Sequence, residues 1–371
     1  MFTAGDLSWD DFLRRHWQRT LWFGPGALAT AAGSVSREEL FALAQRGDVE
    51  SRLIRRDGRR WSVAHGPFTA RQLARLPPRN WTLLINGIEL HLPAMRALAE
   101  RFRALPYARH DDVMASVAAP GGGVGPHFDS YDVFLVQAAG RRRWHVSRQR
   151  DLALVESAPL KLLRRMEKGV KHTVKPGDVL YLPPRVAHDG VAIDACITLS
   201  VGFRAPVPAE LAMRFLDFLH ERFEGGARYA DAGRRHARHP GRLPPEMVTH
   251  AEQVLARLRW GPAAVTAFLG AYLSEPKPHT VFSPPVRPLA RAAFARAAAQ
   301  RGLALDLKSR LLTGAGRAFM NGETARLPAP ARKSVQALAD NRALPPQRLA
   351  AAAVDVLHGW YREGYVTLRD R

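Results

Sequence analysis

The sequence predicts an α+β protein in which a β-sandwich or barrel is followed by helices. Residues 105–205 contain short runs of β-forming residues separated by glycine and proline, as is typical of sandwiches and barrels. From about residue 207, apolar residues recur at the spacing of a helix. The chain has 371 residues, more than one hydrophobic core usually holds. We therefore expect two or three domains.

The first hundred residues are expected to form a mixed α/β segment. Ser36 and Glu39 have the spacing of a capping box, which predicts a helix over residues 40–45. Asp57 and Gly58 form a favourable turn between two short β-type runs, so they predict a hairpin.

The central region is expected to supply the strands of the core. Each β-type run is bounded by glycine, proline or polar turn residues, so each predicts one short strand. The predicted strands cover residues 113–118, 133–137, 143–146, 179–182 and 197–203.

The region after residue 207 is expected to be helical at first and then mixed. Apolar side chains that include Phe215 and Leu219 share one helix face, and Gly225 and Gly226 end this helix. Proline-rich residues 275–288 predict a linker. The remaining predicted elements are helices at 246–258, 263–273, 332–339 and 348–361, a hairpin turn at 321–322 and a strand at 365–368.

Composition limits the functional classes. The single cysteine, Cys196, excludes an intramolecular disulfide framework. No basic, apolar leader begins the sequence and no apolar run reaches membrane-spanning length, so we expect a soluble, cytoplasmic protein without membrane contact. The formal net charge of +21 favours non-specific attraction to nucleic acid, but the basic residues are dispersed and form no recognised nucleic-acid motif.

The stretch from Gly121 to Val133 carries the first half of a predicted metal site. His127 and Asp129 are two residues apart, and in a strand such residues point to the same face. A His-x-Asp pair alone occurs by chance in many proteins. The glycine-rich approach to this pair and the strand that follows it make the pair more specific.

The second half lies about sixty residues later. Residues 175–188 combine a Pro-Gly-Asp turn, a short apolar strand, a proline pair and His188. Two imidazoles and one carboxylate on one face of an octahedron leave positions open for a co-substrate and dioxygen, which is the ligand set of non-haem iron(II) oxygenases. We therefore predict that His127, Asp129 and His188 are the catalytic metal ligands. Other candidates fit neither motif: His172, Asp132 and Asp189.

A 2-oxoglutarate-dependent oxygenase also needs a cation for the distal carboxylate of its co-substrate. Alternation along the strand places Arg142 on the face opposite Arg141 and Arg143, so Arg142 can point inward while its neighbours remain in solvent. A guanidinium matches a carboxylate with two hydrogen bonds. Arg142 is therefore the predicted anchor, although a solvated basic turn is the alternative.

The preceding strand offers further pocket residues. Asp112, Met114 and Ser116 share one face by alternation. Ser116 could donate a hydrogen bond to the co-substrate, and Thr198 is a weaker candidate for the same pocket. Asp112 could bind a cationic substrate side chain beside the aromatic wall of Tyr131, and Met114 is assigned with them to substrate binding. Each could equally be an ordinary core or surface residue.

These motifs resemble the JmjC-type cupins and, within them, the bacterial ribosomal oxygenases. The resemblance extends along essentially the whole chain and is carried by the segments 111–114, 120–133, 140–144, 176–188 and 200–206. It implies an α+β architecture with a double-stranded β-helix core, then a helical dimerisation module and a winged-helix-like C-terminal domain. The corresponding predicted boundaries are 1–206, 207–280 and 281–371.

The resemblance also implies an activity. His127, Asp129 and His188 would bind iron(II), and Arg142 and Ser116 would hold 2-oxoglutarate. Asp112 and Tyr131 match positions that face a substrate arginine in the family. The implied activity is hydroxylation of the β-carbon of an arginine in large-subunit ribosomal protein sixteen, by a homodimer that acts near rRNA. The arginine-rich surface departs from the family pattern and leaves the substrate more open than the chemistry.

Two alternatives remain at this point. A basic surface and a winged helix would also suit an RNA-modifying 2-oxoglutarate oxygenase, or a non-enzymatic nucleic-acid-binding cupin protein. A charge of +21 should repel a basic ribosomal protein at long range, so capture of that substrate would have to be local.

Overall fold

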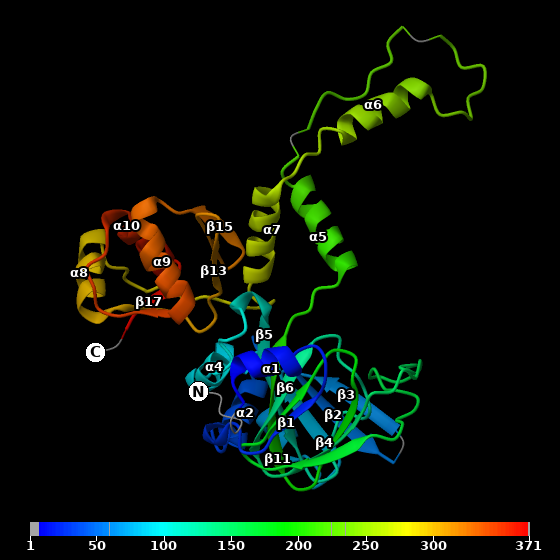
Figure 1. Cartoon of the computed structure of the whole chain (residues 1–371), viewed down its shortest axis with the longest axis vertical. Helices are drawn as coiled ribbons and strands as arrows, with labels where there is room; N and C mark the ends of the chain where they lie inside the picture. Colours follow the sequence, from blue (N-terminus) through cyan, green and yellow to red (C-terminus); the bar gives the residue numbers. More distant parts are fainter. Residues whose placement is uncertain (1–6, 59, 224, 234, 370–371) are drawn as a thin grey trace.

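The computed structural model describes residues 7–58, 60–223, 225–233 and 235–369. A β-rich body and a smaller mixed domain lie side by side, and a helical segment projects away from both (Figure 1). The helices of the β-rich body are α1 (Trp9–Arg15), α2 (Arg37–Ala44), α3 (Ala70–Ala74) and α4 (Pro93–Glu100), with short 3-10 turns at Ala29–Ala31, Ile88–Leu90 and Tyr107–Arg109.

The β-rich body is built on an eight-stranded antiparallel sheet. Its order places β5, the predicted pocket strand, next to the central strand β11. The strands are, across the sheet, β1 (Trp22–Gly24), β9 (Val179–Leu182), β6 (Asp132–Ala139), β11 (Cys196–Phe203), β5 (His110–Ala118), β4 (Trp81–Ile85), β2 (Ser51–Asp57) and β3 (Arg60–His65).

A second, three-stranded sheet faces part of the first. It has the order β10 (Ala187–Ala192), β7 (Arg142–Ser147) and β8 (Val170–Val174). Alternation along β6 explains the packing: Val133 and Leu135 belong to a cluster with Trp144 of the second sheet, whereas Phe134 joins the aromatic core under the N-terminal helices. Nearly every residue of β6 is buried because both of its faces are covered.

Three helices follow the β-rich body, namely α5 (Pro208–His220), α6 (Pro245–Leu255) and α7 (Pro262–Ser274). Neither α5 nor α6 contains a buried residue, and α6 projects furthest from the remainder of the molecule (Figure 1). By contrast, α7 packs on the C-terminal domain. A side chain at Gly270 would meet the ring of Phe319 at 2.3 Å, so only glycine allows this close approach.

The C-terminal domain has its own hydrophobic core, which includes Phe294, Val335 and Leu357. Two small sheets are present, with the orders β16-β12-β17 and β13-β14-β15. Its elements are α8 (Arg291–Arg301), β12 (Leu303–Leu305), β13 (Leu311–Gly314), β14 (Arg317–Met320), β15 (Glu323–Arg326), α9 (Ala329–Asn341), β16 (Ala343–Leu344), α10 (Ala351–Arg362) and β17 (Val366–Leu368).

Arginine side chains join the C-terminal domain to the β-rich body. Arg96 donates to the carbonyl of Leu307 at 2.8 Å, and Arg310 donates to the carbonyl of Asp111 at the start of β5. Burial lowers the pKa of the Arg310 guanidinium from its ordinary value. The C-terminal domain therefore contacts the same strand that carries the predicted substrate residues.

The local sequence predictions are largely confirmed. Ser36 and Glu39 form a capping box, the turn at Gly58 has a positive φ of 56° in a hairpin, and Asn321 and Gly322 join β14 to β15. Every predicted strand is present. Strands β1, β4, β8, β10, β12, β13 and β16 were not predicted, because their short sequences lack a clear alternating pattern. Within the described residues, no helix is both long and apolar enough to cross a bilayer.

Candidate active site

The two predicted metal-binding histidines lie opposite each other across a β-bridge. The amide of His127 donates to the carbonyl of His188 at 2.9 Å, and the reverse bond is 2.8 Å. His188 lies in β10, whereas His127 forms only an isolated bridge and Asp129 lies outside regular structure. The expectation that His127 and Asp129 share a strand is therefore wrong, although the chain is extended enough to keep their side chains together.

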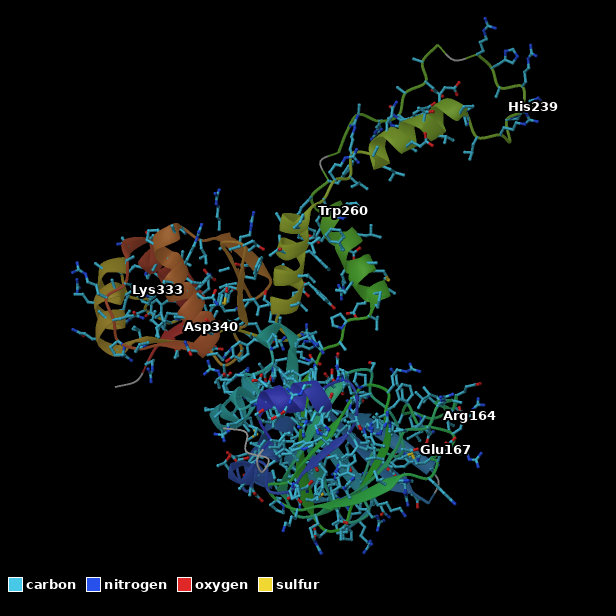
Figure 2. All side chains as sticks on the ribbon, in the orientation of Figure 1. Arg164, Glu167, His239, Trp260, Lys333 and Asp340 are labelled. Carbon is cyan, nitrogen blue, oxygen red and sulfur yellow. The ribbon has the colours of Figure 1, made fainter. Side chains whose placement is uncertain are left out.

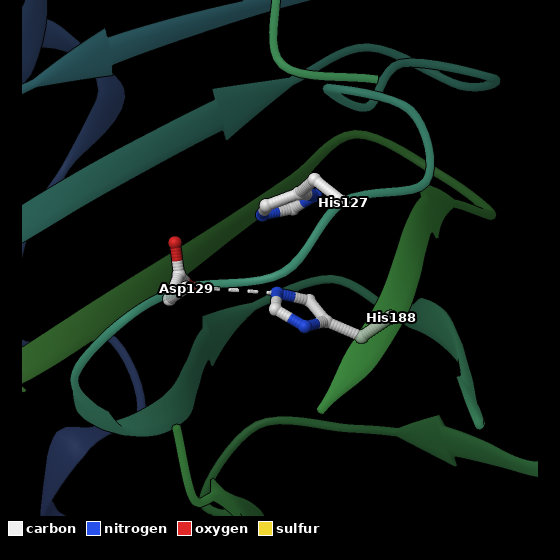
Figure 3. Close-up of side chains that lie close together, drawn as sticks. All are labelled: His127, Asp129 and His188. Atoms are coloured by element: carbon white, nitrogen blue, oxygen red, sulfur yellow. Dashed lines mark ion pairs between the residues drawn. The ribbon is translucent and has the colours of Figure 1, made fainter. Parts of the chain in front are cut away.

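His127, Asp129 and His188 converge at one point (Figure 3). One possible ligand atom from each residue can be chosen so that all lie within 4.8 Å of one another. The Nε2 atom of His188 is 3.6 Å from Oδ2 of Asp129, and the two imidazole centroids are 4.2 Å apart. Among the described residues, this is the cluster of histidine and carboxylate side chains with the geometry of a metal site.

Both imidazoles are oriented by backbone carbonyls. Nδ1 of His127 lies 2.9 Å from the carbonyl of Gly125, and Nδ1 of His188 lies 2.9 Å from that of Val186. If each Nδ1 carries the proton and donates, each Nε2 is left as a lone-pair donor for a metal. Burial is the main cause that lowers the pKa of His188 to about 4, so His188 is neutral at pH 7.

Arg142 lies in the interior beside this cluster. Its side chain points between the two sheets and is 3% exposed, whereas Arg141 and Arg143 are exposed as predicted. Its Nη2 atom donates to Oγ of Ser116 at 3.0 Å, which links β7 to β5. Its guanidinium lies 5.6 Å from the ring centroid of Trp144.

Within the described part of the chain, Arg142 forms a hydrogen bond to Ser116 and no ion pair, and its Nε atom has no hydrogen-bond partner. A buried cation without a counter-ion is costly unless a ligand supplies the missing charge. The indole N–H of Trp144 is also buried without an acceptor. These orphaned donors fit a carboxylate such as the distal one of 2-oxoglutarate.

Thr198 lies on β11 directly opposite Ser116. Its hydroxyl donates to Oε1 of Gln137 at 2.9 Å, and its side chain is almost fully buried. The structure thus brings Thr198 next to Ser116, but the hydroxyl proton of Thr198 is already donated to Gln137. Thr198 remains a predicted pocket residue whose free capacity is to accept a hydrogen bond.

The predicted substrate residues gather around Gly202 on β11. A Cβ atom at Gly202 would lie 3.6 Å from Cε2 of Tyr131 and 3.8 Å from Oδ1 of Asp112. Tyr131 and Asp112 therefore flank one small space, and Met114 lies further along the same face of β5. Burial is the main cause that raises the pKa of the Tyr131 hydroxyl, and Asp129 and Asp112 add to it.

Asp112 carries a partly desolvated carboxyl group. Burial raises its pKa to about 7, and the carboxylate of Asp111 contributes, while the ammonium of Lys277 opposes the rise. The Nζ atom of Lys277 is 3.4 Å from Oδ2 of Asp112. Sequence reasoning missed Lys277, because it lies in the proline-rich linker, far along the chain from β5.

Among the described residues, His172, Asp132 and Asp189 are not part of the His127–Asp129–His188 cluster. The carboxylate of Asp132 accepts hydrogen bonds from Tyr181 at 2.7 Å and Gln18 at 2.9 Å, so it is part of a structural network. His172 contacts the ring of Phe23. Asp189 follows His188 on the strand, and burial raises its pKa.

Two protein-family models match the chain: a JmjC domain at residues 97–211 and a ROXA-like winged helix at residues 257–367. These matches confirm the predicted cupin core and winged-helix domain. They do not test the predicted domain boundaries, and the second match begins before residue 281. Together with the His-Asp-His cluster, they define a JmjC-type oxygenase fold.

The family can be stated more narrowly. The chain is 33% identical over 353 residues to ribosomal protein uL16 3-hydroxylase of Escherichia coli K12, covering 94% of this chain and 93% of that protein. It therefore belongs to the ribosomal oxygenase family, as the motifs indicated. It is also 37% identical over 200 residues to a probable ribosomal oxygenase of Haemophilus influenzae, which covers 53% of this chain and 49% of that protein.

Solved structures agree with this assignment over nearly the whole chain. The crystal structure of E. coli ycfD matches with a TM-score of 0.86 and 32% identity, covering 98% of this chain and 99% of that one. A structure of the same ribosomal oxygenase in complex with cobalt and 2-oxoglutarate matches with a TM-score of 0.83 and 31% identity, over the same shares.

Proposed function

We propose that this protein is an iron(II)- and 2-oxoglutarate-dependent hydroxylase of a ribosomal protein. The observation that carries the proposal is the cluster of His127, Asp129 and His188, together with the buried guanidinium of Arg142 on the strand that pairs with the His188 strand. Two neutral imidazoles and a carboxylate are the donor set of non-haem iron(II) sites. The binding of cobalt and 2-oxoglutarate by the E. coli relative supports this reading.

Each side chain then has a defined task. The three metal ligands would hold the ion on one face, and the carbonyls of Gly125 and Val186 would keep both imidazoles oriented. Arg142 and Ser116 would fix the distal carboxylate of 2-oxoglutarate. When bound, iron and 2-oxoglutarate would supply the chemistry in which dioxygen hydroxylates a C–H bond while 2-oxoglutarate becomes succinate and carbon dioxide.

The proposed substrate is large-subunit ribosomal protein uL16 (protein sixteen), with hydroxylation at the β-carbon of an arginine. The name of the E. coli relative and the space between Asp112 and Tyr131 support this choice. A carboxylate beside an aromatic ring suits a guanidinium, which binds both. Such a substrate also implies work in the cytoplasm, near rRNA.

The net charge of +21 does not prevent this function. Beyond about 10 Å, exposed charges are largely screened at ordinary ionic strength, so recognition depends on the groups nearest the ligand. Those groups include the carboxylates of Asp111 and Asp112, together with Asp48 and Glu50 on the wall of the cavity next to Asp112. Capture of a basic side chain can therefore be local.

The test is a turnover assay with purified protein, iron(II), 2-oxoglutarate and uL16 from ribosomes of cells that lack this chain. We expect succinate release coupled to a gain of one oxygen atom by uL16, located by mass spectrometry of its peptides. The Asp129→Ala variant is the control that should give neither product. An RNA-modifying oxygenase, which the basic surface would suit, predicts the added oxygen on rRNA instead.

We also propose that the protein is a homodimer formed through α5 and α6. These helices bury no side chain within the chain, yet they expose the large apolar residues Met213, Leu216, Met247, Val248 and Leu255. Trp260 at the base of this segment is 58% exposed, and His239 marks its outer end (Figure 2). Apolar faces of this kind mark interfaces. Sedimentation analysis of the wild type and of Leu216→Glu would test this arrangement.

A further inference from the structure

The linker between α7 and α8 crosses the substrate side of the catalytic domain. Lys277 and Pro278 line two separate cavities, one of about 430 Å³ and one of about 400 Å³. Asp112 lines the first cavity, whereas Tyr131 lines the second. The linker thus borders both Asp112 and Tyr131, the two residues assigned to the substrate side chain.

Lys277 makes an uneven pair of contacts there. Its Nζ atom is 2.7 Å from Oδ1 of Asp111 but 3.4 Å from Oδ2 of Asp112. Asp111 has a second cation, because Nε of Arg204 lies 3.1 Å from its Oδ1 atom. Asp112 has no such second cation: within the described residues, its ion-pair contact inside 4.0 Å is to Lys277.

The cavity that Asp112 lines has a volume of about 430 Å³, which is large enough for a cationic side chain. Tyr131 and Asp112 both lie within 3.8 Å of the position that a Cβ of Gly202 would occupy, so the absence of a side chain there leaves room between them. The side chain of Lys277 is 28% exposed, and that of Asp112 is 14% exposed. A guanidinium that entered this space would meet Oδ1 of Asp112, while the ammonium of Lys277 faces Oδ2 of the same carboxylate.

We propose that Lys277 is an internal competitor of the substrate cation at Asp112, and that substrate binding displaces its ammonium onto Asp111 alone. The inference rests on the proposed function, since it assumes a cationic substrate side chain. The displacement is small, because the shorter contact to Asp111 can persist while the longer one is lost. Lys277 thereby weakens the binding of a cationic side chain and leaves that of a neutral one unchanged. A neutral side chain gains too little from Asp112 to displace the ammonium.

Lys277→Met is the variant that tests the inference, and Lys308→Met is its matched control. Lys308 lines the same cavity as Asp112, but its ammonium donates to the carbonyl of Val281 at 2.6 Å. Both variants therefore remove one positive charge from the cavity, and only one removes the cation at Asp112. Lys277→Arg keeps a positive charge at this position, so it separates the effect of the charge from an effect of lost packing.

The probes are two synthetic uL16 peptides. One contains the unmodified arginine that is the proposed target, and the other contains citrulline at that position. The KM is measured by 2-oxoglutarate turnover at pH 9, because loss of the Lys277 ammonium raises the pKa of Asp112 further, and peptide affinity is measured by calorimetry on the metal-free protein. For Lys277→Met we expect the KM of the arginine peptide to fall about fivefold, as for loss of a partly exposed ion pair. The citrulline peptide, Lys308→Met and Lys277→Arg should show no such gain.

An unchanged or higher KM for the arginine peptide in Lys277→Met would overturn the inference, as would an equal change for both peptides. These outcomes leave the proposed function intact if the wild type hydroxylates the arginine peptide. A wild-type protein that neither binds nor hydroxylates the arginine peptide overturns the proposed substrate, and the inference with it.

Discussion

The buried guanidinium of Arg142 gives the sharpest test of the active site. Its side chain is 3% exposed, it donates a hydrogen bond to Ser116, and within the described residues it forms no ion pair. We predict that Arg142→Met abolishes tight 2-oxoglutarate binding without loss of folding. Arg143→Met, on the exposed face of the same strand, is the matched control.

The expected loss of 2-oxoglutarate affinity in Arg142→Met follows from the charged groups that remain unpaired with and without 2-oxoglutarate bound. With 2-oxoglutarate bound, loss of the guanidinium leaves a buried carboxylate without its cation, at a cost of about 2–5 kcal/mol. A value of about 3 kcal/mol corresponds to a KM for 2-oxoglutarate about 150-fold higher, at ~1.36 kcal/mol per tenfold. Without 2-oxoglutarate, the variant loses one hydrogen bond, worth about 1 kcal/mol, and is relieved of an unpaired buried charge.

The two effects are measured separately. Steady-state turnover gives the KM for 2-oxoglutarate, and thermal unfolding with and without 2-oxoglutarate gives the ligand-dependent rise in Tm. We expect Arg142→Met to be at least as stable as the wild type without ligand and to show almost no rise in Tm with it. A variant that unfolds on its own, or that keeps the wild-type rise, would show that Arg142 is structural.

Three further predictions concern neighbouring groups. Asp129→Ala should lose metal binding and turnover below detection, as measured by metal analysis and succinate release, and full activity would refute the metal assignment. Ser116→Ala should raise the KM for 2-oxoglutarate about fivefold through loss of one hydrogen bond, and an unchanged value would remove Ser116 from the pocket. Since the pKa of Asp112 is about 7, its charge is lost as pH falls, so the KM of the arginine peptide should rise about tenfold per unit below pH 7. In Asp112→Asn, the KM of the arginine peptide should not rise below pH 7. If this rise persists in the variant, Asp112 is not the group that binds the substrate cation.

The sequence determined the chemistry of the pocket because that information is local. The His-x-Asp pair, the turn before His188 and the alternation that buries Arg142 are each carried by a few adjacent residues. Strand and turn signals were equally local, so the hairpin at Gly58 and the capping box at Ser36 could be predicted. The resemblance then supplied the winged helix, which periodicity alone would not have specified.

Only the tertiary structure decided which distant residues meet. The paired backbone hydrogen bonds that hold His127 against His188 join segments about sixty residues apart, and no local pattern encodes that register. Lys277 reaches Asp112 because the C-terminal domain docks on β5 and carries the linker across the substrate site. A contact between segments so far apart depends on the packing of whole domains, which neither spacing nor composition reveals.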